Sequence, residues 1–143
     1  MANNIIAIDI GNTNTSVGLV DTEKLLCKKS YTFHSNNVIE NILNTFKQIQ
    51  GEYPTLDLFT IKICTVIRSI QQDLDRALSN SSYINKVFFV KYHKNLPVNI
   101  RYENPDTLGA DRIANLLYSL KKYRKENVII IDGVNDHSSA QNQ

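Results

Sequence analysis

The hydrophobic positions in the first half of the chain change from a two-residue spacing to a helical spacing and back. Residues 4–10, 15–20 and 24–34 are predicted to be three successive strands with short connections. A helix is predicted next, with Asn37 as its N-cap, Glu40 three residues later and Gly51 just past its end. Alternating apolar residues then predict a fourth strand over residues 58–66.

The second half of the chain alternates helices with short, continuously apolar segments. Ser69 and Gln72 predict the start of a second helix, and a third is expected from Thr107 to Tyr123. The apolar segments occupy residues 87–90 and 128–131, and such segments indicate parallel strands covered on both faces. The predicted fold class is α/β, with a three-stranded meander followed by β-α-β-α units in a mixed sheet. Residues 133–143 carry almost no apolar side chains and are expected to form a disordered tail.

Composition narrows the functional classes. The chain has 143 residues, of which 42% are hydrophobic and 21% charged, and this suits one globular domain. Its formal net charge of +2 is too small to favour nucleic acid as a partner. Cys27 and Cys64 stand in separate predicted strands, where we expect buried thiols in a reducing compartment. Because neither a signal peptide nor a membrane-length apolar run is recognisable, the expected location is the cytoplasm, with no membrane partner.

The first candidate site is the stretch "AIDIGNTNTSVGLV", residues 7–20, in which a predicted strand ends in Asp9 and breaks into small polar residues. Gly11 allows a tight turn, and the hydroxyl, amide and backbone N–H groups after it can form a concavity for phosphate oxygens. Asp9 is suited to hold Mg²⁺ through a water molecule. The alternative is an ordinary hairpin turn in which Asp9 caps its own loop, and this stretch alone slightly favours that alternative.

The second candidate site is "RYENPDTLGADRIANLLYSL", residues 101–120. Asp106 or Thr107 is expected to cap the helix, and the small pair Gly109-Ala110 leaves its first turn open to an anion or small polar ligand. Asp111 can act there as a general base, and Arg112 as a bidentate clamp for a carboxylate. Alternatively, Asp111 only complements the helix dipole and Arg112 is solvated, and this segment alone favours that interpretation.

Three further observations concern single residues. Tyr102 is a candidate ligand contact, with core packing as the alternative. Asp9 ends the first predicted strand and Asp132 the last, so their carboxylates face one crevice if these strands are parallel neighbours. The three histidines show no metal-ligand spacing and are expected on the surface or in loops.

In this order and spacing, the segments "DIGNTNTSVGL", "ICTVIRSIQQDLDRAL" and "YENPDTLGADR" resemble the type III pantothenate kinases, the family of the Bvg accessory factor proteins. The resemblance implies an RNase H-like domain of the actin-like ATPase superfamily over residues 4–132. It also implies phosphorylation of pantothenate by ATP to 4′-phosphopantothenate, the first step of coenzyme A biosynthesis. The implied cofactors are Mg²⁺ and a monovalent cation, K⁺ or NH₄⁺, and the implied assembly is a homodimer whose interface lies near the active site.

The resemblance also implies roles for residues of both candidate sites. Asp111 would be the catalytic base, Asp9 a Mg²⁺ ligand and Asp132 a ligand of the monovalent cation. The implied ATP phosphate loop consists of Asp9, Ile10, Gly11, Asn12, Thr13, Asn14, Thr15 and Ser16. The implied pantothenate contacts are Tyr102, Gly109, Ala110, Asp111 and Arg112. Phosphoryl transfer depends mainly on positioning and charge neutralisation, so one base, one metal and a backbone cradle would be sufficient.

The chain departs from the family's pattern after Asp132, where Val134 and Asn135 stand in place of a Gly-Thr pair. The family's second domain is absent, so we expect this chain to be inactive alone, without a partner domain to close the cleft against water. The polar end favours a disrupted reading frame, and natural or artificial truncation stays open. Two other functions also stay open. One is a non-catalytic nucleotide- or pantothenate-binding or regulatory module, and the less favoured one is an RNase H-like nuclease using Asp9, Asp111 and Asp132 around two metals.

Overall fold

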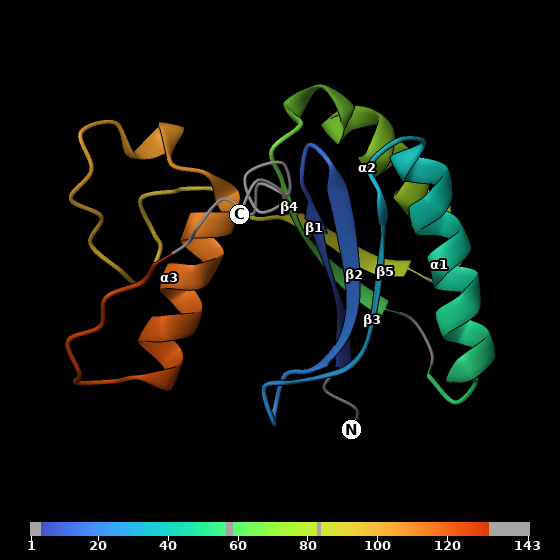
Figure 1. The fold of residues 1–143 in the computed structure, drawn as a ribbon, viewed down its shortest axis with the longest axis horizontal. Coiled ribbons are helices and arrows are strands. Elements are labelled where there is room, and N and C mark those ends of the chain that lie inside the picture. Colours follow the sequence, from blue (N-terminus) through green and yellow to red (C-terminus); the bar gives the residue numbers. More distant parts are fainter. Residues whose placement is uncertain (1–3, 57–58, 83, 132–143) are drawn as a thin grey trace, which may run out of the picture.

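A five-stranded sheet with helices on both faces forms the protein in a computed structural model, which describes residues 4–56, 59–82 and 84–131 (Figure 1). The strands are β1 (Asn4–Ile10), β2 (Asn14–Asp21), β3 (Leu26–His34), β4 (Phe59–Thr65) and β5 (Ile84–Phe89). Their order in the sheet is β3-β2-β1-β4-β5. Strands β1 to β3 pair antiparallel, whereas β4 runs parallel to β1 and β5 runs parallel to β4. The predicted meander and mixed α/β sheet are confirmed.

The helices divide between the two faces of this sheet. Helices α1 (Val38–Glu52) and α2 (Gln71–Ser79) lie on one side, and α3 (Ala110–Lys122) lies on the opposite side (Figure 1). Short 3₁₀ turns at Arg68–Ile70 and Pro105–Thr107 precede α2 and α3. In the part of the chain that the structure describes, no helix is long and apolar enough to cross a membrane.

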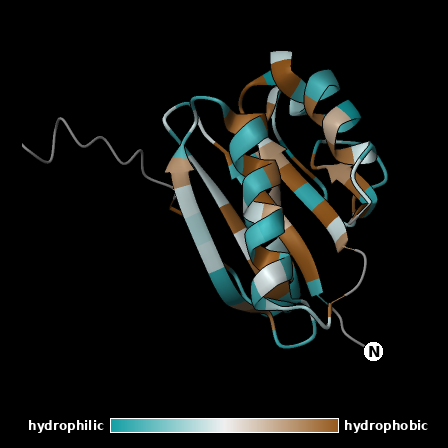
Figure 2. Ribbon diagram, turned by 90° about the vertical axis from the view of Figure 1, so that its right-hand side faces the viewer, coloured by the Kyte–Doolittle hydropathy of each residue, from teal (hydrophilic) through white to brown (hydrophobic). Residues whose placement is uncertain are grey.

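The main core lies between the sheet and the pair α1 and α2. Successive side chains of a strand point to opposite faces, so the even-numbered isoleucines of β1 face these helices while Asp9 faces the other side. Figure 2, seen from the side of α1, shows this helix lying across hydrophobic strand segments. The core residues are Ile6, Ile8, Ile10, Val17, Leu19, Val38, Ile42, Phe46, Ile49, Phe59, Ile61, Ile63, Leu74 and Leu78.

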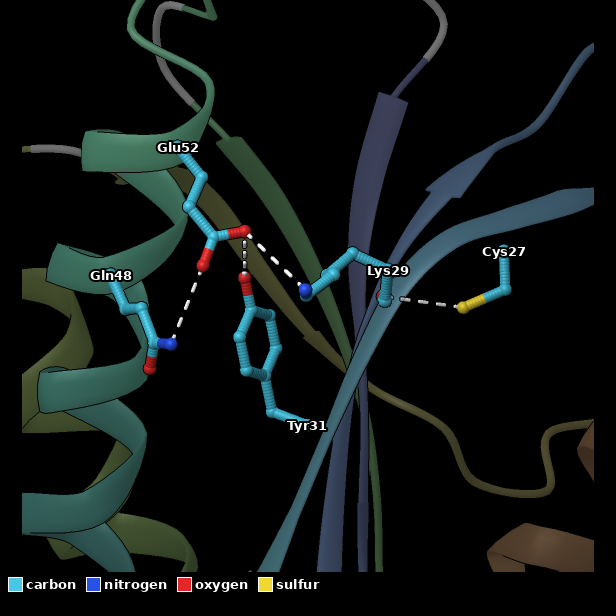
Figure 3. A network of polar contacts seen from close by, with 5 residues as sticks. All are labelled: Cys27, Lys29, Tyr31, Gln48 and Glu52. Atoms are coloured by element: carbon cyan, nitrogen blue, oxygen red, sulfur yellow. Dashed lines mark hydrogen bonds and ion pairs between the residues drawn. The ribbon is translucent and has the colours of Figure 1, made fainter.

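The edge strand β3 is fastened to the end of α1 by a polar network around Glu52 (Figure 3). The Tyr31 hydroxyl donates to Glu52 Oε2 over 3.0 Å, and Lys29 Nζ lies 3.8 Å from the same oxygen. Gln48, one turn earlier in α1, donates to Glu52 Oε1 over 3.4 Å. Burial and the hydrogen bond to Glu52 raise the pKa of Tyr31 to about 12. These contacts hold a strand that buries little apolar surface of its own.

The predicted start of α1 is confirmed, because the helix begins at Val38 directly after Asn37, but the predicted end of α1 and the predicted start of α2 were wrong. Asn37 occupies the N-cap position, but it has a left-handed backbone (φ 49°) and makes no side-chain capping bond, so the predicted capping by its side chain is wrong. Gly51 lies inside α1, because the helical backbone continues to Glu52. Helix α2 begins at Gln71 after the 3₁₀ turn and has no side-chain cap.

The start of α3 also lies later than predicted. Asp106 and Thr107 belong to the preceding 3₁₀ turn, where Thr107 Oγ1 donates to the Asn104 carbonyl over 2.6 Å. That bond occupies the hydroxyl, and the backbone then extends before the helix starts at Ala110. The predicted capping by Asp106 or Thr107 is therefore wrong.

The predicted strand at residues 128–131 is absent, and the segment is irregular, with Ile129 89% and Ile131 90% exposed. The hypothesis that Asp9 and Asp132 face one crevice required this segment to be a strand beside β1. The two neighbours of β1 are instead β2 and β4. Asp132 and the predicted tail 133–143 lie outside the described residues.

Both thiols were predicted to be buried, and for Cys27 this prediction is wrong. Cys27 is exposed, because β3 is an edge strand, while Cys64 on the inner strand β4 is half-buried.

Candidate active site

A cavity of about 750 Å³ lies between α3 and the sheet face opposite α1 and α2, and we name it the central cavity. The sheet contributes Asp9 from β1, Ser16 from β2 and Cys64 from β4 to its lining. Helix α3 contributes Asp111 and, one turn later, Asn115. Asp9 and Asp111, one from each candidate site of the sequence, therefore line the same cavity.

Asp9 is brought to this cavity by the pairing of β1. It lies opposite Ser16 of β2 and Cys64 of β4, near the end of both ladders. Its side chain is exposed, whereas its neighbours Ile8 and Ile10 are buried in the main core. The alternation of the strand thus anchors the backbone and presents the carboxylate to the cavity.

The turn after Asp9 is tight and depends on a glycine. The N–H of Gly11 donates to the Asn14 carbonyl over 3.0 Å. A Cβ at Gly11 would lie 2.9 Å from that same carbonyl oxygen, which is closer than real contacts allow. Asn12, Thr13 and Asn14 are exposed at the tip of the turn, and their polar groups are accessible to a ligand.

Asp111 is held in the first turn of α3 by a similar close approach. The carbonyl of Gly109 accepts bonds of 3.1 Å from the N–H groups of Arg112 and Ile113. A Cβ at Gly109 would lie 2.7 Å from Asp111 Oδ1, so the absence of a side chain there leaves room for the carboxylate. Ile113 is fully buried, and the Cys64 thiol donates to the Ala110 carbonyl over 3.6 Å. These contacts fix the start of α3 against the end of β4.

The charged residues that line the central cavity are Asp9, Asp111 and Lys62, so negative charge is in excess. Burial raises the pKa of Cys64 to about 11, and the negative charges of Asp9 and Asp111 contribute in the same direction. Both carboxylates are therefore close enough to act on the same thiol, which stays protonated and neutral near pH 7. The two carboxylates suit a divalent cation, which could accompany an anion.

A second cavity, of about 740 Å³, adjoins the start of α3 and carries the opposite charge. Its lining includes Arg68, Lys91 and His93, together with Asp106 and the pair Gly109-Ala110. We name it the basic cavity. Arg68 and Lys91 thus line the same cavity as Gly109 and Ala110, which directly precede Asp111.

Comparison with known proteins decides the family. The family model described as type III pantothenate kinase matches residues 5–133. The chain belongs to the type III pantothenate kinase family. Its relatives named type III pantothenate kinase include proteins from Sulfurihydrogenibium sp., 31% identical over 81% of this chain, and from Cytophaga hutchinsonii, 30% identical over 76%. A relative of the same name from Frankia casuarinae is 26% identical over 88% of this chain.

The predicted family is confirmed, but the chain spans less than half the length of each of these relatives. The aligned part covers 46% of the Sulfurihydrogenibium protein, 39% of the Cytophaga protein and 49% of the Frankia protein. The matched region contains both candidate sites and the helices and strands that carry them.

The residues that the resemblance to type III pantothenate kinases implies are partly brought together by the structure. Asp9, Ser16 and Asp111 line the central cavity, and Gly109 and Ala110 line the basic cavity. Tyr102, 48% exposed, and the exposed Arg112 line neither cavity. The side chains of Ile10 and Thr15 are fully buried, so a ligand would meet only their backbone.

Four residues near these sites were not singled out from the sequence. Asn115 was detectable, because it follows Asp111 by four residues and so shares its helix face. Lys62 and Cys64 reach the central cavity only through the pairing of β4 with β1, and a single sequence carries no signal for that. Ser35, between β3 and α1, contacts the turn after Asp9 by tertiary hydrogen bonds that also leave no sequence signal.

Among the described residues, no three His, Cys, Asp or Glu side chains converge to hold a metal ion. A cation near Asp9 would therefore complete its coordination with water and ligand oxygens, as Mg²⁺ prefers. The cation site expected at Asp132 lies outside the described residues and stays a prediction.

Proposed function

We propose that this chain provides the ATP and pantothenate sites of a pantothenate kinase, which forms 4′-phosphopantothenate in the first step of coenzyme A biosynthesis. One observation carries the proposal: Asp9 beside the polar turn and Asp111 of α3 line the same cavity. Phosphoryl transfer needs a phosphate site and a base within reach of each other, and this cavity has room for both reacting groups.

In this mechanism Asp111 accepts the proton of the primary hydroxyl of pantothenate. The freed oxygen forms a bond to the γ-phosphorus of ATP while the bond to the β–γ bridging oxygen breaks, and ADP leaves with that electron pair. The exposed turn of residues 11–14 offers N–H and side-chain donors to the phosphate oxygens. The missing side chain of Gly109 supports this role, because it leaves room for the Asp111 carboxylate.

The negative charge of the central cavity fits a role for Mg²⁺. Asp9 would hold the ion together with water, and the residues present offer the oxygen donors that it prefers. When bound, Mg²⁺ neutralises charge on the transferred phosphoryl group. A monovalent cation, K⁺ or NH₄⁺, at Asp132 completes the proposal.

The carboxylate of pantothenate needs a cationic partner away from Asp111. Arg68, Lys91 and His93 of the basic cavity are suited to that charge. Tyr102 and Arg112, which stand outside both cavities, would contact pantothenate only after rearrangement of their side chains.

We further propose that the protein acts in the cytoplasm and self-associates. Both of its cysteines are free thiols, as in reducing compartments. Exposed large apolar residues gather on α3 and the segment after it, and they include Tyr118, Leu120, Tyr123, Ile129 and Ile131. Such a surface favours association. Sedimentation as a monomer at all concentrations in analytical ultracentrifugation would contradict self-association.

Calorimetric titration of the purified chain with Mg-ATP and with pantothenate tests the proposed sites. Asp9→Asn is expected to weaken Mg-ATP binding, and Asp111→Asn to alter pantothenate binding. Asp73→Asn on the exposed side of α2 is the matched control, because its loss removes only a surface ion pair with Arg76. A folded chain that binds neither ligand, or equal losses in all three variants, would contradict the proposal. Binding of both ligands without ADP formation is expected of this chain alone, and ADP formation would show that it is active without a partner domain.

A further inference from the structure

We propose that Ser35 is the positioning residue of the phosphate turn, which it holds in the shape that receives the phosphates of a nucleotide. This inference rests on the proposed ATP site. Ser35 lies in the connection between β3 and α1, more than twenty residues from the turn in sequence. It is not itself placed to touch the reacting atoms, and it acts through the turn of residues 11–13.

Three hydrogen bonds join Ser35 to the two sides of this turn. Its hydroxyl donates to the Gly11 carbonyl over 2.6 Å, and its backbone N–H donates to the Thr13 carbonyl over 2.8 Å. The hydroxyls of Ser35 and Thr15 are 2.9 Å apart. A serine hydroxyl has one proton, so Ser35, which gives that proton to Gly11, accepts from Thr15.

These bonds orient the backbone donors of the turn. Peptide bonds are planar, and the described residues contain no cis peptide, so a carbonyl and the N–H of the next residue point in opposite directions. Because the Gly11 carbonyl points to Ser35, the N–H of Asn12 points away from Ser35, on the exposed side of the turn. Ser35 thereby directs a donor outward, where an anion can be bound.

The burial of the partners makes this arrangement hard to replace. The Thr15 side chain is fully buried, and the Ser35 hydroxyl is its hydrogen-bond partner. Without that hydroxyl, Thr15 would have to find a new acceptor, and the Gly11 carbonyl would lose its 2.6 Å donor. A buried polar group without a partner is costly, so the turn is expected to rearrange.

The test compares Ser35→Ala with Ser35→Thr, which keeps the hydroxyl, and with Thr45→Ala as a matched control. Thr45 is a buried threonine of α1 whose hydroxyl donates to the Asn41 carbonyl over 2.8 Å, away from the turn. Thr45→Ala removes one hydrogen bond of a part-buried hydroxyl and Ser35→Ala removes two, so the control shows what the loss of such a hydroxyl does away from the turn.

Two readouts separate the positioning role from the proposed function. In hydrogen exchange without nucleotide, we expect Ser35→Ala to lose the protection of the Gly11 and Ser35 amides, and the other two variants to keep it. In calorimetry, we expect Ser35→Ala to raise the Kd for Mg-ATP about tenfold, the size of one lost hydrogen bond. Ser35→Thr and Thr45→Ala are expected to stay within about twofold of the wild type.

Unchanged exchange in Ser35→Ala would overturn the inference, and so would equal effects in Ser35→Ala and Thr45→Ala. Failure of Ser35→Thr to preserve protection would also overturn it, because the hydroxyl would then not be the cause. A wild-type chain that binds no Mg-ATP contradicts the proposed function instead, and the exchange experiment still decides the role of Ser35.

Discussion

The reactivity of Cys64 gives a direct test of the central cavity, because its thiol lies near the proposed base Asp111 and the proposed Mg²⁺ ligand Asp9. Burial and the charges of Asp9 and Asp111 raise its pKa from 9.0 to about 11. At about pH 8 such a shift lowers the thiolate fraction about a hundredfold. A thiolate of higher pKa is intrinsically more nucleophilic, and over two pKa units this returns about tenfold. The net expectation is a rate about tenfold lower than that of an ordinary thiol, before any slowing by restricted access.

The assay follows the reaction of both cysteines with 4,4′-dithiodipyridine by peptide mass spectrometry, and the urea-unfolded chain supplies the reference rate for each. Cys64 is expected to react at least about tenfold more slowly in the folded chain. The exposed Cys27 serves as the internal control and is expected to change little. Asp9→Asn and Asp111→Asn should each speed the reaction of Cys64, since each removes a charge that disfavours the thiolate. Equal folded and unfolded rates for Cys64, or no acceleration in either variant, would refute this description of the cavity.

Four further predictions concern three glycines and two titrating side chains. Gly109→Ala places a Cβ within 2.7 Å of Asp111 Oδ1, so it should displace the carboxylate and weaken pantothenate binding in calorimetry without weakening Mg-ATP binding. Gly11→Ala meets a backbone oxygen at 2.9 Å and should lower the free energy of unfolding in urea, by about 1–3 kcal/mol. Gly51→Ala in α1 meets nothing within 4 Å and should instead raise it, by about 0.5–1 kcal/mol. Folding raises the pKa of Cys64 from 9.0 to about 11 and that of Tyr31 from 10.0 to about 12. The folded chain therefore keeps these protons at pH values at which the unfolded chain releases them. The free energy of unfolding should consequently fall as pH rises from 9 toward 12. Cys64→Ala and Tyr31→Phe should each remove part of that fall, and a flat alkaline profile in the wild type would contradict both assignments.

The sequence predicted the sheet and its helices well because their periodicities reflect burial on one face or both. The alternation in β1 and the helical stripe of α1 each correspond to residues of the main core. Helix boundaries were harder to predict. Asn37 looked like an N-cap by residue type, but its left-handed backbone prevents the capping bond. The apolar run 128–131 resembled a buried strand, yet the strands beside β1 were already supplied by β2 and β4. Strand pairing is a property of the whole chain, and local patterns do not encode it.

The candidate site was predictable only in its parts. The polar turn after Asp9 and the glycine before Asp111 are visible as local motifs. That Asp9 and Asp111 line the same cavity depends on the placement of α3 against β4, which is fixed by the buried Ile113 and the contact of Cys64 with Ala110. The support of the turn by Ser35 likewise arises from long-range hydrogen bonds between a loop and a distant connection.

The most direct test of the central claim, that the two motifs form one site, is an NMR titration of the ¹⁵N-labelled chain with Mn²⁺-ATP. The paramagnetic ion broadens amide signals according to their distance from it. If Asp9 holds the metal beside the phosphate turn, broadening will be strongest in residues 9–16 and will extend across the central cavity to residues 109–112 at the start of α3. Asp9→Asn should remove this pattern, while Asp73→Asn should leave it unchanged. Broadening of the turn that leaves the start of α3 unaffected, or broadening centred elsewhere in the chain, would contradict a shared site.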